Sequence, residues 1–380
     1  MPHLQADHLP DDWARATLLG RIDQGEGPTP VLVRDGQIVD MSRVAPTVSE
    51  LVAQRAFDPS AGTPLGALGD LALASEEGAA ARLLSPIDLQ CVKAAGVTFA
   101  VSALERVIEE RARGDAGQAA AVRGRLEERI GGGLRSVRPG TAEAAALKQA
   151  LIDDGMWSQY LEVAIGPDAE IFTKGPPLSS VGWGADIGVR SDSSWNNPEP
   201  EVVLLVAPDG KPVGATLGND VNLRDFEGRS ALLLGKAKDN NASCSVGPFV
   251  RLFDDTYGMD DVRAAQIALR IEGTEGYTLD GASSMAEISR DPEDLIRQAL
   301  SEHHYPDGFV LFLGTLFAPT QDRDAPGRGF THKEGDVVRI SNPQLGRLEN
   351  RVTTSKAAPA WTMGAGALMR NLARRGLLAA

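Results

Sequence analysis

The sequence predicts an α+β protein, with a smaller mixed domain over residues 1–165 and a β-rich domain over residues 166–380. Its 380 residues are enough for two domains with a sizeable core. Residues 115–131 and 142–163 are rich in Ala, Leu, Glu and Arg, which favour helix. After Pro167 the chain changes to short apolar runs separated by Gly and Pro, a pattern typical of strands.

The N-terminal part carries weaker signals for several further elements. Its first residues are polar and contain prolines, which predicts an arm, and residues 57–80 lack a clear period, which predicts a loop. The expected elements are a hairpin over residues 31–39 turned at Asp35-Gly36, a short helix capped by Thr47 or Ser49 and ending near Ala56, a strand within residues 87–99, and a helix over residues 104–111.

The C-terminal part predicts strands more often than helices. Apolar runs of strand length recur along it, and two amphipathic segments predict helices. The expected strands lie at residues 171–173, 202–206, 213–217, 265–271, 309–313, 337–340 and 348–352, and the expected helices at residues 292–302 and 365–375.

Composition excludes several classes of partner. Hydrophobic residues make up 42% of the chain and charged residues 24%, as in ordinary globular proteins. The net charge of −14 argues against nucleic acid or an acidic membrane surface as the main partner. It does not oppose a small anionic substrate, because a bound metal ion can set the local field. With neither a leader nor an apolar run of the ~18 residues that a membrane span needs, we expect a cytoplasmic protein.

Two glutamates, Glu199 and Glu201, stand in front of the apolar run 202–206. On a strand, residues two apart share a face, so the two carboxylates would lie about 6.6 Å apart along the chain. The run ends at Asp209-Gly210, a turn signal between two apolar segments. A two-residue loop there would place Glu199 opposite Asp220.

The same register would place Glu201 opposite Gly218, whose missing side chain would leave room between the carboxylates. Three close carboxylates repel one another unless protons or a cation neutralise them. Oxygen ligands favour a hard divalent ion, Mg²⁺ first and then Mn²⁺ or Ca²⁺. The alternative is that Glu199, Glu201 and Asp220 are solvated strand carboxylates, because a bulge would break the register.

Other candidates for chemistry lie further along the chain. A lysine at Lys238 that is held near a metal and partly desolvated would have a lowered pKa, although a solvated loop lysine is the alternative. Glu170 could supply a carboxylate for acid–base work, or be an exposed strand-edge charge. The Gly314 amide and Thr315 hydroxyl could hold a substrate carboxylate.

Several short motifs stand in a fixed order around these candidates. They are Glu199-x-Glu201, Gly218-Asn219-Asp220-Val221, Arg224-Asp225, Gly247-Pro248, Gly314-Thr315, Gly335-Asp336-Val337-Val338 and residues 345–352. This ordered set resembles the fumarylacetoacetate hydrolase superfamily over roughly residues 165–360. The resemblance implies a mixed β-roll C-terminal domain in which two glutamates and an aspartate bind one Mg²⁺ that chelates a 2-oxo acid.

Within that superfamily the chain is most similar to the bacterial 2-keto-3-deoxy-D-xylonate dehydratases, and this likeness includes residues 18–22, 94–99 and 195–199. It implies Mg²⁺-dependent dehydration of 2-keto-3-deoxy-D-xylonate to 2,5-dioxopentanoate in pentose catabolism. The catalytic residues implied are Lys238 and Glu170, and the substrate-binding residues implied are Ser102, Arg106, Gly314 and Thr315. Members of the superfamily are commonly homodimers or higher homo-oligomers.

One departure bears on the reaction. Hydrolases and decarboxylases of the superfamily carry Gly-x-Asn-Tyr-x-x-His, whose histidine helps to activate water, and Ser102 occupies that position here. The absence of this base favours elimination of water over attack on a C–C bond. A hydrolase or decarboxylase acting on a β-diketo or other 2-oxo acid is the main alternative, and a non-catalytic module that binds 2-oxo acids is the second.

Overall fold

The computed structural model describes residues 3–76, 78–119, 122–123, 137–315, 317, 319, 321–326 and 328–378. Within these residues the fold is α+β with mixed sheets, as the sequence predicts. The helix predicted over residues 115–131 falls largely outside the described residues. None of the described helices is both long enough and apolar enough to cross a membrane.

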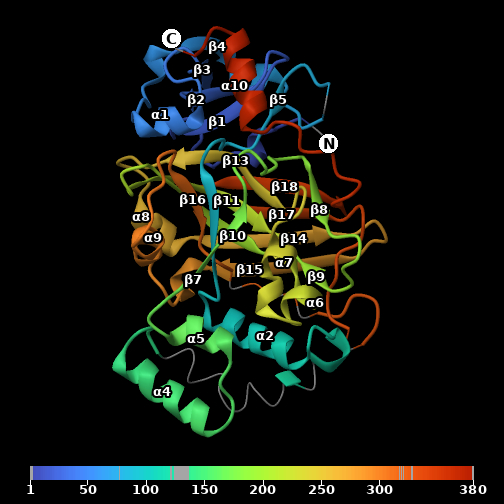
Figure 1. Cartoon of the computed structure of the whole chain (residues 1–380). Helices are drawn as coiled ribbons and strands as arrows, with labels where there is room; N and C mark the ends of the chain where they lie inside the picture. The colour runs from blue at the N-terminus through green and yellow to red at the C-terminus, as the bar shows by residue number, and fades with distance from the viewer. Residues whose placement is uncertain are drawn as a thin grey trace.

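The larger sheet has eleven strands and contains the predicted hairpin of the carboxylates at its centre (Figure 1). This sheet contains strands from both sides of residue 165, where the sequence predicts a domain boundary. The division into two domains at that residue stays a prediction. The strands, in order across the sheet, are β4 (Thr63–Ala67), β3 (Gln37–Asp40), β2 (Thr29–Arg34), β1 (Leu18–Asp23), β13 (Cys244–Leu252), β11 (Pro212–Asp220), β10 (Pro200–Val206), β16 (Phe309–Phe312), β6 (Cys91–Gly96) and β7 (Glu170–Gly175), with β5 (Arg82–Leu83) beside β1.

A second sheet packs against the first. Its strands, in order, are β15 (Thr278–Ser284), β14 (Gln266–Glu272), β17 (Val337–Asn342), β18 (Gly346–Thr354) and β8 (Asp186–Val189). A separate two-stranded sheet is formed by β9 (Asn196–Asn197) and β12 (Asn222–Leu223). Buried and exposed residues alternate along β14, whereas every residue of β10 is buried. One face of the second sheet therefore meets solvent, while both faces of β10 are covered.

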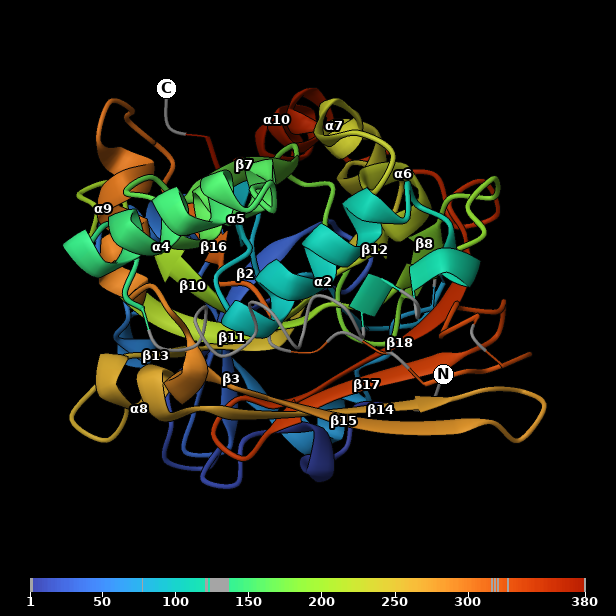
Figure 2. The same cartoon turned by 90° about the horizontal axis from the view of Figure 1, so that it is seen from below.

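Helices lie at both ends of the molecule and around the sheets. Figure 1 shows α1 and α10 beside β1 to β4 at one end, and α2, α4 and α5 at the other end, which Figure 2 views directly. The helices are α1 (Val48–Ala53), α2 (Ala100–Arg111), α4 (Ala142–Asp153), α5 (Gln159–Ile165), α6 (Arg224–Glu227), α7 (Leu234–Lys238), α8 (Met259–Ala264), α9 (Pro292–Leu300) and α10 (Ala365–Arg374), with short 3₁₀ turns at Ala6–His8, Pro59–Ala61, Leu68–Leu71, Ala231–Leu233 and Met285–Glu287.

Some local predictions are confirmed and others are wrong. The hairpin at Asp35-Gly36 is present, and Thr47 caps α1 by accepting a hydrogen bond from the Glu50 amide. The helix predicted over residues 142–163 is broken, because Gly155 has a φ of +66° and Ser158 starts a new helix as its cap. The loop predicted over residues 57–80 contains the edge strand β4.

Candidate active site

The register of the β10–β11 hairpin brings the predicted carboxylates together. Glu201 pairs with Gly218, as predicted. The Asp220 amide donates to the Glu199 carbonyl at 3.1 Å, which places these two residues opposite each other. Glu199, Glu201 and Asp220 are all buried, and each offers a carboxylate oxygen within 4.8 Å of the others.

The turn of this hairpin is longer than predicted. The Ala207 amide donates to the Lys211 carbonyl at 3.0 Å, so residues 208–210 form a three-residue loop, and the prediction of two is wrong. The pairing then skips Val213, which forms a β-bulge in β11. Because the bulge absorbs the extra loop residue, the predicted register is restored before the strands reach the carboxylates.

The space beside Glu201 is filled differently from the prediction. A Cβ on Gly218 would lie 2.3 Å from Cε1 of Phe312, so this ring, from β16, occupies the gap expected there. The Gly314 amide donates to Glu201 Oε2 at 2.6 Å. Burial, together with the charges of Asp220 and Glu199, raises the pKa of Glu201 well above its usual range. A cation bound beside Glu201 would therefore offset both the cost of burying its carboxylate and its repulsion by Asp220 and Glu199.

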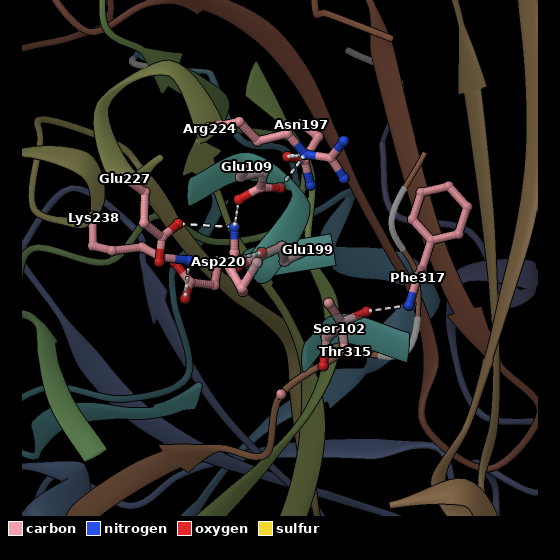
Figure 3. A network of polar contacts seen from close by, with 12 residues as sticks. Ser102, Glu109, Asn197, Glu199, Asp220, Arg224, Glu227, Lys238, Thr315 and Phe317 are labelled. Carbon is pink, nitrogen blue, oxygen red and sulfur yellow. Dashed lines mark hydrogen bonds and ion pairs between the residues drawn. The ribbon is translucent and has the colours of Figure 1, made fainter. Parts of the chain in front are cut away.

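Lys238 lies against two of the three carboxylates. It ends α7, and its Nζ is 2.5 Å from Glu199 Oε2 and 3.0 Å from Asp220 Oδ2 (Figure 3). Burial acts to lower the pKa of Lys238, but the negative charges of Asp220, Glu199 and Glu227 act more strongly in the opposite direction. The pKa of Lys238 therefore lies above its usual value. The expectation of a lowered pKa concerned a lysine beside a bound metal and stays a prediction, while the predicted nearness to the cluster is confirmed.

Glu170 reaches the same place from the edge of the large sheet. It opens β7 directly opposite Gly96 of β6. A Cβ on Gly96 would lie 2.1 Å from Glu170 Oε2, so the glycine leaves the space that the carboxylate occupies. Burial raises the pKa of Glu170, with Arg106 and Lys238 opposing the rise. The alternative of an exposed strand-edge charge is excluded by this position.

Arg106 of α2 joins the N-terminal helices to the cluster. Its guanidinium lies 2.5 Å from Glu199 Oε1, 2.7 Å from Glu109 Oε2 and 2.9 Å from Glu227 Oε2. Arg224 of α6 lies 3.1 Å from Glu109 Oε1, so α2 and α6 exchange ion pairs in both directions (Figure 3). Burial, aided by Glu199 and Glu109, raises the pKa of Glu227 to about 7.

Sequence reasoning did not find Glu109 or Glu227. The signal that could have found them is an Arg and a Glu three residues apart on a helix, which occurs in both α2 and α6. It also missed Lys174, a buried lysine of β7 that lies 2.8 Å from Asp220 Oδ1.

The remaining predicted residues lie at the rim of the cluster. The Ser102 hydroxyl donates to the Phe99 carbonyl at 2.8 Å and accepts from the Phe99 amide at 3.2 Å, which holds the first turn of α2. Thr315 accepts a hydrogen bond from the Phe317 amide at 3.0 Å, and Figure 3 shows Ser102 beside Thr315. Their roles toward a substrate stay predictions.

One cavity gathers these side chains, and its lining is mostly polar and charged. Five carboxylates face two cations across it, and no described residue of the lining is a histidine. The lining consists of Ala95, Gly96, Val97, Ser102, Arg106, Glu170, Phe172, Glu199, Glu201, Asp220, Glu227, Lys238, Gly314 and Thr315. All nine residues predicted from the sequence are among them.

A family model supports the resemblance drawn from the motifs. The model of the fumarylacetoacetate (FAA) hydrolase C-terminal domain matches residues 156–353, just over half of the chain. Those residues contain the three carboxylates, Glu170 and Lys238. Ser102 and Arg106 lie outside the match.

Two curated relatives are similar in sequence. The chain is 33% identical over 202 residues to a probable 2-keto-3-deoxyxylonate dehydratase of Haloferax volcanii, covering 53% of this chain and 66% of that protein. It is 32% identical over 182 residues to the 2-dehydro-3-deoxy-D-arabinonate dehydratase of Saccharolobus solfataricus, covering 47% of this chain and 57% of that protein. The chain thus spans less than two thirds of the length of either relative.

Solved structures show the same fold over most of the chain. A 2-keto-3-deoxy-D-arabinonate dehydratase complexed with magnesium and 2,5-dioxopentanoate superposes with a TM-score of 0.64 at 22% identity, covering 89% of this chain and 99% of that one. Its apo form gives a TM-score of 0.62 at the same identity and coverage. At this identity the likeness shows the fold and not the activity.

Proposed function

Because this chain belongs to the fumarylacetoacetate hydrolase family, we propose that it is a Mg²⁺-dependent sugar-acid dehydratase that converts 2-keto-3-deoxy-D-xylonate to 2,5-dioxopentanoate. The observation that carries the proposal is the cavity in which Lys238 and Glu170 stand beside three clustered carboxylates, without a histidine among the described lining residues. Both curated relatives are named as dehydratases, which supports the proposal.

The donor set fits a hard divalent ion. Glu199, Glu201 and Asp220 would hold it, because three buried carboxylate oxygens within 4.8 Å of one another match the ligands that Mg²⁺ prefers. Mn²⁺ and Ca²⁺ use the same ligand type. When bound, the ion supplies Lewis-acid polarisation of the substrate's 2-keto group, a contribution of several kcal/mol.

The substrate class follows from the charges that line the cavity. A 2-keto-3-deoxy pentonate carries one carboxylate, and Arg106 and Lys238 are the cations of the lining. We propose that Ser102, Arg106, Gly314 and Thr315 bind and orient it from the rim. The D-xylonate and D-arabinonate derivatives are one compound, because the 2-keto group and the missing C3 hydroxyl remove two stereocentres. The open choice is the configuration at C4.

Lys238 and Glu170 would move the protons. One of them takes a proton from C3 and the other gives a proton to the C4 hydroxyl, which leaves as water. A proton then leaves C5, C3 regains a proton, and the resulting C4–C5 enol becomes the aldehyde of 2,5-dioxopentanoate. The sum is loss of one water with no carbon lost, and each general acid or base typically contributes 10² to 10⁴ in rate.

A hydrolase or decarboxylase of the same family is the alternative. Such a reaction would need a base that activates water for attack on carbon. Ser102 stands at the histidine position of those enzymes, and its hydroxyl is engaged with the Phe99 backbone at the start of α2. This engagement favours elimination over hydrolysis.

The test is a product assay on the purified protein with Mg²⁺ and each C4 epimer of 2-keto-3-deoxy-pentonate. We expect the D epimer to give 2,5-dioxopentanoate, detected by NMR, without release of CO₂. Cleavage of a β-diketo acid or release of CO₂ from a 2-oxo acid, with no semialdehyde, would favour the alternative. Binding of the sugar acid without any turnover would point to a binding module.

A further inference from the structure

Lys174 is a fully buried cation that stands behind the cavity and does not line it. It belongs to β7, where Gly175 pairs with Val92 and Thr173 pairs with Lys93. The pairing therefore skips Lys174, which forms a β-bulge. A bulge re-aims the side chain of the extra residue, and here the side chain turns into the interior, with the residue 1% exposed.

The ammonium group of Lys174 ties together three segments around the cluster. Its Nζ lies 2.8 Å from Asp220 Oδ1 and donates to the Val221 carbonyl at 3.3 Å. It also donates to the Lys238 carbonyl, and to Ser243 Oγ at 3.4 Å. Ser243 itself donates to the same Lys238 carbonyl at 2.8 Å. One buried charge thus contacts the end of β11, the end of α7 and the loop that follows.

Asp220 is held by a different lysine on each oxygen. Lys174 contacts Oδ1, while Oδ2 contacts Lys238, which lines the cavity. A buried ammonium without a carboxylate partner would be costly, and Asp220 is the only carboxylate within ion-pair distance of Lys174 among the described residues. The contact therefore fixes which oxygen of Asp220 points toward the cavity.

We propose that Lys174 is a positioning residue that orients Asp220 toward the metal and holds the backbone of Lys238 in place for proton transfer. The inference rests on the proposed Mg²⁺ site and adds a residue that neither the motifs nor the resemblance identified. Removing a residue that hydrogen-bonds to a metal ligand typically lowers metal affinity or activity by about 10- to 100-fold.

The experiment compares Lys174→Met with Lys93→Met in the full chain. Lys93 comes from the neighbouring strand β6 and contacts Thr173 at an exposed position, so it is a matched control for loss of a strand lysine. Mg²⁺ affinity is measured by calorimetry, and the rise of Tm with Mg²⁺ is measured in parallel. We expect about a 10- to 100-fold loss of Mg²⁺ affinity for Lys174→Met, and no loss for Lys93→Met.

At saturating Mg²⁺, kcat of Lys174→Met should stay reduced by about 10-fold or more, because the Lys238 backbone has lost a partner. Unchanged Mg²⁺ affinity in a folded Lys174→Met overturns the inference. Lys174→Gln, which keeps donors and drops the charge, is the second variant, and failure of both variants to fold would make Lys174 a residue of the fold alone. Absence of Mg²⁺ binding by the unaltered protein would instead count against the proposed function.

Discussion

The carboxylate of Glu170 lies in the space that a side chain on Gly96 would fill. The two residues face each other across β6 and β7, and a Cβ on Gly96 would lie 2.1 Å from Glu170 Oε2. The Glu170 carboxylate can therefore lean over the neighbouring strand only because that strand has no side chain at Gly96. A substitution at Gly96 therefore tests the role of the Glu170 carboxylate without changing Glu170 itself.

Gly96→Ala should displace the Glu170 carboxylate from the cavity. We expect kcat to fall by about 10²-fold or more, as for loss of a general acid or base, while Mg²⁺ affinity stays the same. Gly69→Ala is the control, because a Cβ there meets no atom within 4 Å. Steady-state kinetics and calorimetry check both variants, and full activity of Gly96→Ala would argue against a role for Glu170.

Lys238→Ala should separate proton transfer from metal binding. Its Nζ contacts Glu199 and Asp220, but an ammonium is not a metal ligand, so Mg²⁺ should still bind. We expect kcat to fall by about 10² to 10⁴. Lys236→Ala, on the exposed side of α7, is the matched control. Near-normal turnover of Lys238→Ala would contradict the assigned role.

Glu201→Gln should weaken Mg²⁺ binding more than it affects the fold. The pKa of Glu201 is raised by burial and by Asp220 and Glu199, so the neutral amide removes a repulsive charge and should not destabilise the metal-free protein. Calorimetry should show a large loss of Mg²⁺ affinity relative to Glu287→Gln, a change at the surface. Equal affinity in the two variants would argue against the three-carboxylate site.

The raised pKa of Glu227 predicts that the folding stability of the metal-free protein depends on pH. The pKa of Glu227 is raised from 4.5 to about 7 in the folded protein, chiefly by burial. The stability it contributes is therefore full below about pH 4.5 and lost as pH rises through about 7. At about 1.36 kcal/mol per pKa unit, the loss is about 3 kcal/mol.

Urea unfolding in EDTA, repeated between about pH 4.5 and 8, measures this dependence. Glu227→Gln should decline less across that range than the unaltered protein, because the amide does not titrate. Glu287→Gln is the control and should follow the unaltered protein. Parallel curves for all three proteins would show that Glu227 does not carry the linkage.

Much of the site could be read from the sequence because it depends on short-range rules. The two-residue period of a strand placed Glu199 and Glu201 on one face, and Asp220 lies opposite Glu199 because the bulge at Val213 offsets the error in loop length. The motif order placed Glu170 and Lys238 by resemblance, and both line the cavity. In the second sheet, β14, β17 and β18 were predicted because their apolar residues alternate, whereas β15 and β8 were not predicted.

Other elements were missed where local signals conflict with the fold. The central strand β13 contains Gly247 and Pro248, which argue against a strand in any local reading, yet it pairs with β1 and β11. The break at Gly155 is hidden within a segment of good helix formers. At β13 tertiary packing outweighs local preference, whereas the break at Gly155 follows from the local signals of a glycine and a serine cap.

The sequence by itself determined the ligand type, the shared face of Glu199 and Glu201, and the family. Only the tertiary structure decided how the cluster is held: the bulge at Val213 that restores the register, the bulge that turns Lys174 inward, and the ion pairs of Arg106. The physical reason is that ligand type follows from side-chain chemistry, and a shared face follows from the two-residue period along one strand. A buried charged residue such as Arg106 or Lys174 is stabilised by partners from distant segments of the chain. The positions of these residues in the sequence do not indicate which of them will pair.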